Sequence, residues 1–164
     1  MKVLITDGGR IDAGFSKKGA GDCVCRAITI VTGLPYQQVY ARLAEGNATQ
    51  RRRRGIRIGQ TLVPRRQKER VRSASNGIST KRKWFNDYMM SLGFEWVPTM
   101  RVGQGCKVHL RDGELPNGRL VVSVSKHMCA VIDGVIHDTH DPSRGGTRCV
   151  YGYYVLQLRK DGRP

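Results

Sequence analysis

A cysteine at the start of a helix is the residue best placed to do chemistry in this sequence. Asp22 precedes Cys23 as a candidate N-cap, an apolar run over residues 27–31 follows, and Gly33 ends the segment. The N-terminus of a helix presents unpaired N–H groups and the positive end of the helix dipole, and both favour a thiolate. The sequence therefore predicts a nucleophilic Cys23. The alternative interpretation is that Cys23 and Cys25 are two small buried apolar side chains.

A nucleophilic cysteine needs a base, and three of the four histidines lie on or beside one hairpin. Asp133-Gly134 is a strong signal for a two-residue turn between two strands. With that turn, His127 and Asp138 are diagonal neighbours on one face, and His137 lies on the other. Asp138 would then hold one imidazole nitrogen of His127 while the other faces the thiol. A one-residue change in turn length would nominate Asp141 instead. The alternative is that these are ordinary polar groups at the end of a hairpin.

The order of these residues resembles that of the papain-like cysteine peptidases, in which a cysteine opens a helix and a histidine and an acid follow on successive strands. Residues 21–27 and 125–138 look like the small bacterial and phage branch, whose best-known members are the bacteriocin-leader (double-glycine) peptidases. The resemblance implies that Cys23 is the nucleophile, His127 the base and Asp138 the orienting residue. It also implies an α+β fold in which the N-terminal catalytic helix packs on a C-terminal antiparallel sheet.

Two further observations concern the same residues. The family usually places a glutamine before the cysteine as an oxyanion donor; Lys17 stands at that position here, which leaves the backbone N–H of Cys23 and an unassigned second donor. Cys23, Cys25, Cys106 and His109 could together supply zinc ligands. However, side chains two positions apart on a helix point roughly 200° apart. We therefore expect no metal and no other cofactor.

The elements that must position these residues follow from apolar periodicity and from glycine and proline stops. Trp84, Tyr88 and Leu92 recur every four residues, with Phe85 and Met89 beside them, and we expect this stripe in the core. Helices before antiparallel strands indicate one α+β domain over residues 1–164. The predicted helices are Cys23–Thr32, Pro35–Glu45 closing at Gly46, and Ser79 or Thr80 to Gly93. The predicted strands are 3–6, 94–97, 120–124, 128–132, 135–138 and 150–158.

Positive charge is concentrated in one segment of a chain whose net charge is +16. Residues 51–83 contain 13 Lys or Arg and a single acidic residue, Glu69. We interpret the segment as a basic insert, at about 47–78, that contacts nucleic acid or another acidic partner. A solvated surface loop is the alternative, and the absence of aromatic residues from it argues against base stacking. The candidate contact residues are Arg51, Arg52, Arg53, Arg54, Arg65 and Arg66.

The number and spacing of the cysteines bear on the compartment. Five irregularly spaced cysteines predict free thiols and no disulfide framework, which favours the cytoplasm, or the host cytoplasm for a phage protein. No apolar run approaches the roughly 20 residues of a membrane span. Our leading hypothesis is a thiol hydrolase that cleaves a peptide or isopeptide bond in a peptide or protein substrate. The same residues would serve an acyl transferase or a deamidase. The alternative is a non-catalytic protein of peptidase fold that binds nucleic acid or an acidic partner through its insert.

Overall fold

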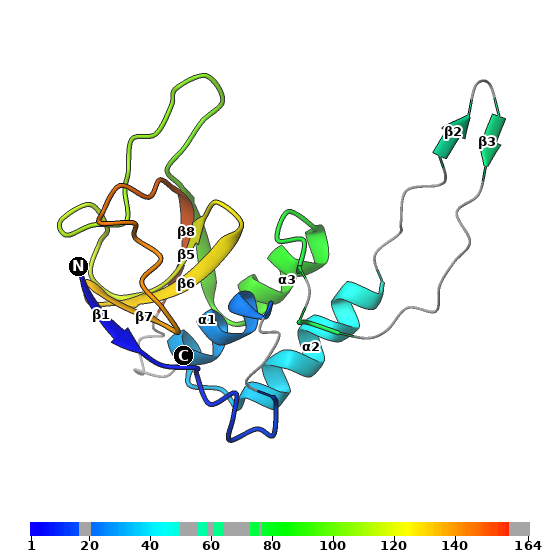
Figure 1. Ribbon diagram of the computed structural model, residues 1–164, viewed down its shortest axis with the longest axis horizontal. Coiled ribbons are helices and arrows are strands. Elements are labelled where there is room, and N and C mark those ends of the chain that lie inside the picture. Colours follow the sequence, from blue (N-terminus) through cyan, green and yellow to red (C-terminus); the bar gives the residue numbers. More distant parts are fainter. Residues whose placement is uncertain (17–20, 50–55, 59–60, 64–72, 76, 158–164) are drawn as a thin grey trace.

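A six-stranded mixed sheet and three helices form the main body of the part of the chain that the computed structural model describes, residues 1–16, 21–49, 56–58, 61–63, 73–75 and 77–157. The helices lie together on one side of the sheet (Figure 1), so the fold is α+β, as predicted. In chain order the elements are β1 (Lys2–Ile5), α1 (Cys23–Thr32), α2 (Tyr36–Ala48), β2 (Ile56–Ile58), β3 (Thr61–Val63), α3 (Lys83–Ser91), β4 (Phe94–Pro98), β5 (Arg119–Val124), β6 (His127–Ile132), β7 (Val135–Asp138) and β8 (Val150–Leu156).

The order of strands in the large sheet is β1-β7-β6-β5-β8-β4. All neighbours are antiparallel except β1 and β7, which are parallel, so the expectation of an antiparallel sheet is wrong at this edge. Parallel pairing requires a long connection, and the whole helical layer lies between β1 and β7 in the sequence. As a result β1 covers the edge of β7, and the N–H of Thr6 donates to the carbonyl of Asp138 at 2.9 Å.

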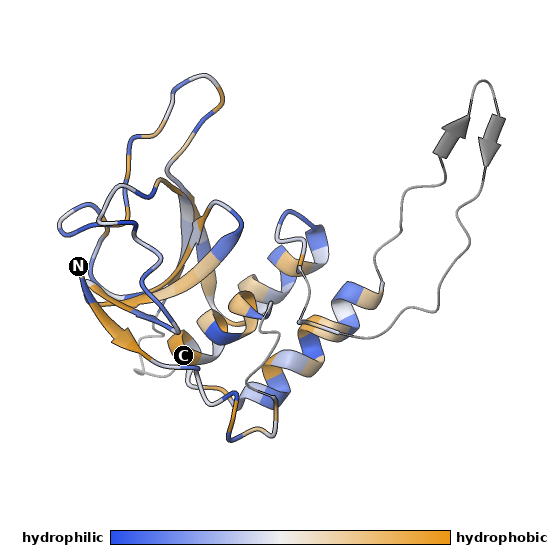
Figure 2. Cartoon of the chain, in the orientation of Figure 1, coloured by the Kyte–Doolittle hydropathy of each residue, from blue (hydrophilic) through white to orange (hydrophobic). Residues whose placement is uncertain are grey.

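Each face of the sheet carries its own buried apolar cluster. On the helical face, Ile28 and Val31 of α1 share a cluster with Met128 and Ala130 of β6. On the opposite face, Val131 belongs to a second cluster, which Leu110 of the segment between β4 and β5 helps to close. Figure 2 shows apolar residues along the strands and on α1. Because α1 is held against β6 by these contacts, the start of the helix lies close to the start of the strand.

The bounds of α2 and α3 differ from the prediction. α2 begins at Tyr36, after Pro35, and continues through Gly46 to Ala48. A Cβ at position 46 would come within 2.2 Å of the Trp84 ring, so glycine lets the two helices approach there. α3 begins at Lys83, after an extended Arg82, and not at Ser79 or Thr80. Of the predicted core stripe, Phe85 is fully buried along with Met89, whereas the other three side chains are half-buried against the same cluster.

Most residues of the basic insert lie outside the part of the chain that the structure describes. Arg51, Arg52, Arg53, Arg54, Arg65 and Arg66 all lie outside the described residues. Within the insert, β2 and β3 pair as a separate two-stranded antiparallel sheet, a hairpin that the sequence analysis did not predict. No helix in the described ranges is long and apolar enough to span a bilayer.

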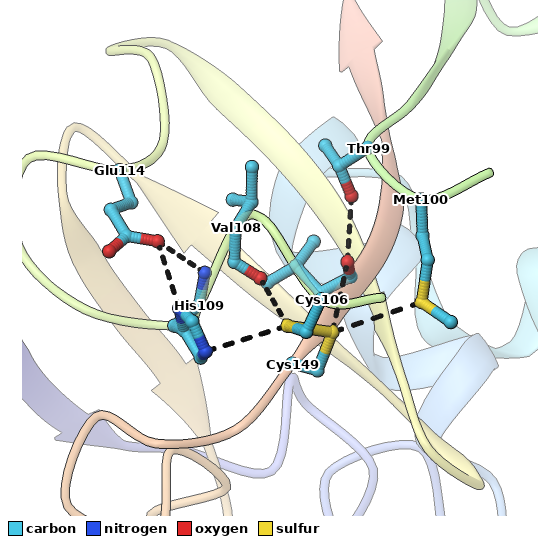
Figure 3. The surroundings of a disulfide bond; sticks show 8 residues. Thr99, Met100, Cys106, Val108, His109, Glu114 and Cys149 are labelled. Carbon is cyan, nitrogen blue, oxygen red and sulfur yellow. Dashed lines mark hydrogen bonds and ion pairs between the residues drawn. A yellow bond between two sulfur atoms is a disulfide. The ribbon is translucent and has the colours of Figure 1, made fainter. Parts of the chain in front are cut away.

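A disulfide between Cys106 and Cys149 corrects the expectation that all cysteines are free (Figure 3). The backbone of His109, close to Cys106, pairs with that of Cys149 in an isolated antiparallel β-bridge. The segment before β5 therefore lies against the start of β8. This pairing joins residues 43 positions apart, and for that reason it left no sign in the local sequence. The disulfide also removes Cys106 from the set of metal ligands considered above. Free thiols at all five positions are therefore no longer an argument for a reducing compartment.

Candidate active site

Cys23 is the first residue of α1, as predicted, but Asp22 does not cap the helix with its side chain. The Asp22 carboxylate is buried and points inward, where it accepts a 2.6 Å bond from Nε of Arg10 and further bonds from Arg26 and Tyr36. A carboxylate between two cations gains more than one cap bond provides. The amides at the start of α1 are consequently not occupied by this carboxylate.

The hairpin has the predicted register. Ile132 pairs with Val135 and Ala130 with His137, across a turn in which Asp133 and Gly134 both have positive φ, 46° and 76°. This is the conformation of a two-residue type I′ turn.

The register places His127 and Asp138 on one face, and their side chains meet there. Nε2 of His127 lies 2.5 Å from Oδ2 of Asp138. The other candidate acid, Asp141, accepts a 2.8 Å bond from the N–H of Ser143 in its own loop. The structure therefore brings Asp138, and not Asp141, to His127.

Asp138 is held from several sides. Its side chain is buried, and its Oδ1 accepts a 2.7 Å bond from the N–H of Thr139 and lies 3.5 Å from Nη2 of Arg26. Burial by itself would raise the pKa of Asp138, but the bond and charge of His127, with the amide of Thr139, hold it below its ordinary value. Asp138 is thus an ionised carboxylate with a fixed orientation.

The imidazole of His127 also lies close enough to the Cys23 thiol for each group to shift the pKa of the other. Because Nε2 faces Asp138, Nδ1 is the nitrogen left for the sulfur. Burial would raise the pKa of the Cys23 thiol, but the His127 ring, the backbone N–H of Met128 and the charge of Arg26 lower it. Burial would also lower the pKa of His127, but its bonds to Asp138 and Cys23 raise it to about 9. The two shifts together favour a thiolate–imidazolium pair.

The remaining cysteines lack these features. Burial raises the pKa of Cys25 to about 12 and also raises that of Cys129. Cys106 and Cys149 form the disulfide. Cys23 is therefore the one thiol of the chain whose surroundings favour the nucleophilic form.

The other histidines have separate surroundings. His140 lies beside His127, with 5.2 Å between the ring centroids. His137 lies on the opposite face, as the register predicted, and burial lowers its pKa. His109 is bound to Glu114, with its Nδ1 3.3 Å from the carboxylate (Figure 3). Within the described ranges, no three His, Cys, Asp or Glu side chains gather in a way that could hold a metal ion.

A groove with a volume of about 1140 Å³ is lined in part by Met128, the residue that follows His127 in the chain. The strand register continues from Met128 through Ser123 and Gly152 to Pro98, and all of these except Gly152 line the groove. A Cβ on Gly152 would lie 2.3 Å from the Trp96 ring, so this glycine lets the ring, which also lines the groove, pack directly against β8. The groove thus runs across the sheet from β6 to β4, and Cys23, His127 and Asp138 are not among the residues that line it.

Sequence reasoning missed the charged groups behind the site. Arg10, Arg26 and Tyr36 surround Asp22, and Arg26 also reaches Asp138. The spacing of Asp22 and Arg26, four residues apart on one helix, was a signal that could have revealed the first contact. Lys17, at the position of the expected oxyanion donor, lies outside the described residues.

No protein-family model, curated protein or solved structure matches this chain.

Proposed function

We propose that this protein is a thiol hydrolase of papain-like architecture that cleaves a peptide or isopeptide bond. The observation that carries the proposal is the position of His127, which bonds to the Asp138 carboxylate through Nε2 and lies close enough to the Cys23 thiol to lower its pKa. A nucleophile, a base and a group that orients the base are the minimum for covalent acyl transfer. The packing of the helix that bears the cysteine against the strand that bears the histidine supports the papain-like assignment.

The proposed reaction has two steps. The Cys23 thiolate attacks the carbonyl carbon, and the imidazolium of His127 gives its proton to the leaving amine, which leaves an acyl thioester on Cys23. Water then attacks the thioester, His127 takes the proton of the water, and the sulfur leaves as a thiolate. Asp138 keeps the ring in position in both steps. The backbone N–H of Cys23 is the first candidate donor to the oxyanion, because the side chain of Asp22 does not cap this end of the helix.

The groove lined by Met128, which follows His127 in the chain, favours a peptide as the substrate. Trp96, Met100 and Tyr151 line it and are all exposed, at 41%, 41% and 39%. The strand at its far end, β4, is the last strand of the sheet in the described part of the chain. Exposed aromatic and aliphatic side chains beside a strand edge suit an extended chain with apolar residues.

A simple acyl donor tests the proposal without knowledge of the substrate. We expect 4-nitrophenyl acetate to leave an acetyl group on Cys23, detected by mass spectrometry, and then to be turned over by water. His127→Ala should abolish turnover, whereas His137→Ala, on the opposite face of the same hairpin, should retain it. Fluorogenic peptides with apolar residues then test amide cleavage. A folded parent protein that acquires no acetyl group on Cys23 would exclude the proposed chemistry.

The charge of residues 51–83 favours a second candidate, a non-catalytic protein that binds nucleic acid or an acidic partner. The two candidates differ in what they require of Cys23. A binding protein has no need of a thiol with a lowered pKa, and the acyl-donor experiment separates them.

A further inference from the structure

Arg26 occupies an unusual position behind the proposed site. It lies in the first turn of α1 and is only 3% exposed, although it carries a charge. One guanidinium nitrogen, Nη1, donates to Oδ1 of Asp22, and the other, Nη2, lies 3.5 Å from Oδ1 of Asp138. One planar group therefore joins two carboxylates from different parts of the fold.

Each of the two carboxylates that Arg26 joins is directly linked to a group of the proposed site, one through the chain and the other through a hydrogen bond. Asp22 immediately precedes Cys23 in the chain, and Asp138 holds Nε2 of His127 through its second oxygen. The contact therefore ties the helix that carries the nucleophile to the strand that orients the base.

The surrounding charges alternate and are mostly buried. Arg10 and the hydroxyl of Tyr36 hold Asp22 from the side away from Arg26. Through the interior the series is Arg10, Asp22, Arg26, Asp138 and His127, and each group contacts the next. Cys23 adjoins two members of this series, because it follows Asp22 in the chain and lies close enough to His127 for its pKa to be lowered. Removing one partner from a buried charged chain leaves its neighbours uncompensated.

We propose that Arg26 is a positioning residue, which sets the geometry of Cys23 relative to His127 by holding Asp22 and Asp138 together. The inference rests on the proposed function. Arg10 makes a comparable buried contact with Asp22 but, among the described residues, does not bond to Asp138. A change at Arg10 is therefore the matched control for a change at Arg26.

The test follows the rate of Cys23 alkylation by iodoacetamide against pH, without reductant, in folded variants. Arg26→Lys keeps a positive charge but cannot hold two carboxylates with one planar fork. In this variant we expect the rise of the Cys23 alkylation rate with pH to shift to higher pH by about one unit. The rate at about pH 6 should then fall about tenfold, the equivalent of one pKa unit. Arg10→Lys should shift the pH at which the Cys23 alkylation rate rises much less. Arg26→Met should have at least the effect of Arg26→Lys.

A double variant shows whether Arg26 acts through Asp138. In an Asp138→Asn background, the further change Arg26→Lys should have little effect on the rate, because the contact is already weakened. The inference is overturned if Arg26→Lys reacts like the parent, if Arg10→Lys has an equal effect, or if the two changes are additive. If Arg26→Met does not fold, Arg26→Lys decides. A parent protein whose Cys23 reacts like an ordinary thiol would instead refute the proposed function.

Discussion

Replacing His127 by Gln should make Cys23 an ordinary or poorer nucleophile at neutral pH. Gln keeps much of the size of the ring and can still bond to Asp138, but it carries no proton to give and no positive charge. The remaining large influence on the Cys23 thiol is burial, which raises its pKa. We therefore expect the pKa of Cys23 in this variant to rise to its ordinary value of 9.0 or above.

The size of the effect has an upper bound. A thiol with a pKa of 9.0 is about 0.3% ionised at about pH 6.5. If the parent thiol is fully ionised there, loss of ionisation alone slows alkylation about 300-fold. A thiolate of lower pKa is intrinsically less nucleophilic, by about threefold per pKa unit, which offsets part of this difference. We expect a net loss of about tenfold or more near neutral pH, and convergence of the two rates above about pH 10.

The assay is limited labelling with iodoacetamide, followed by peptide mass spectrometry of each cysteine. Without reductant, Cys106 and Cys149 are protected as the disulfide, so the measurement compares Cys23 with Cys25 and Cys129. The control is His137→Gln, on the opposite face of the hairpin. The reasoning is refuted if both variants slow Cys23 equally, or if Cys25 or Cys129 reacts first in the parent protein.

Three further predictions concern other parts of the molecule. Asp138→Asn should lower the pKa of His127 from about 9, because it removes a bonded carboxylate, and the ring protons followed by NMR should titrate at lower pH than in the parent. Gly46→Ala should reduce the free energy of unfolding by roughly 1–3 kcal/mol, because the new methyl group meets the Trp84 ring, and thermal denaturation measures this. Changing Arg51–Arg54 to Ser should weaken duplex DNA binding and flatten its salt dependence, by a slope of about 0.9 per lost phosphate contact, while Cys23 alkylation is retained. An unchanged binding isotherm across salt concentrations would contradict this last expectation.

The part of the site that the sequence predicted is the part determined by local rules. The register of the hairpin depends on a two-residue turn, and once Asp133 and Gly134 adopt positive φ the pairing of every following residue is set. The face shared by His127 and Asp138 follows from that register alone. The start of α1 at Cys23 follows in the same way from the residues that flank it.

The features that the sequence did not reveal depend on residues that are distant in the chain. The carboxylate of Asp22 turns inward because Arg10 and Tyr36, 12 and 14 positions away, are already there in the folded protein. The parallel pairing of β1 depends on where the helical layer returns the chain. Gly46 lies inside α2 and not after its end, at the point where Trp84 packs against it from another helix. In each case a tertiary contact outweighs a local preference that pointed elsewhere.

The inward turn of Asp22 explains how an acidic residue can directly precede a nucleophilic cysteine. A free carboxylate beside a thiol disfavours the thiolate. Here the charge of Asp22 raises the pKa of Cys25, whereas Cys23 is influenced by His127 and by the positive charge of Arg26. The same carboxylate that would disfavour the Cys23 thiolate as a cap thus binds the arginine whose charge favours it. Two adjacent features of the sequence, an acid before the cysteine and an arginine three residues after it, therefore belong to one electrostatic arrangement.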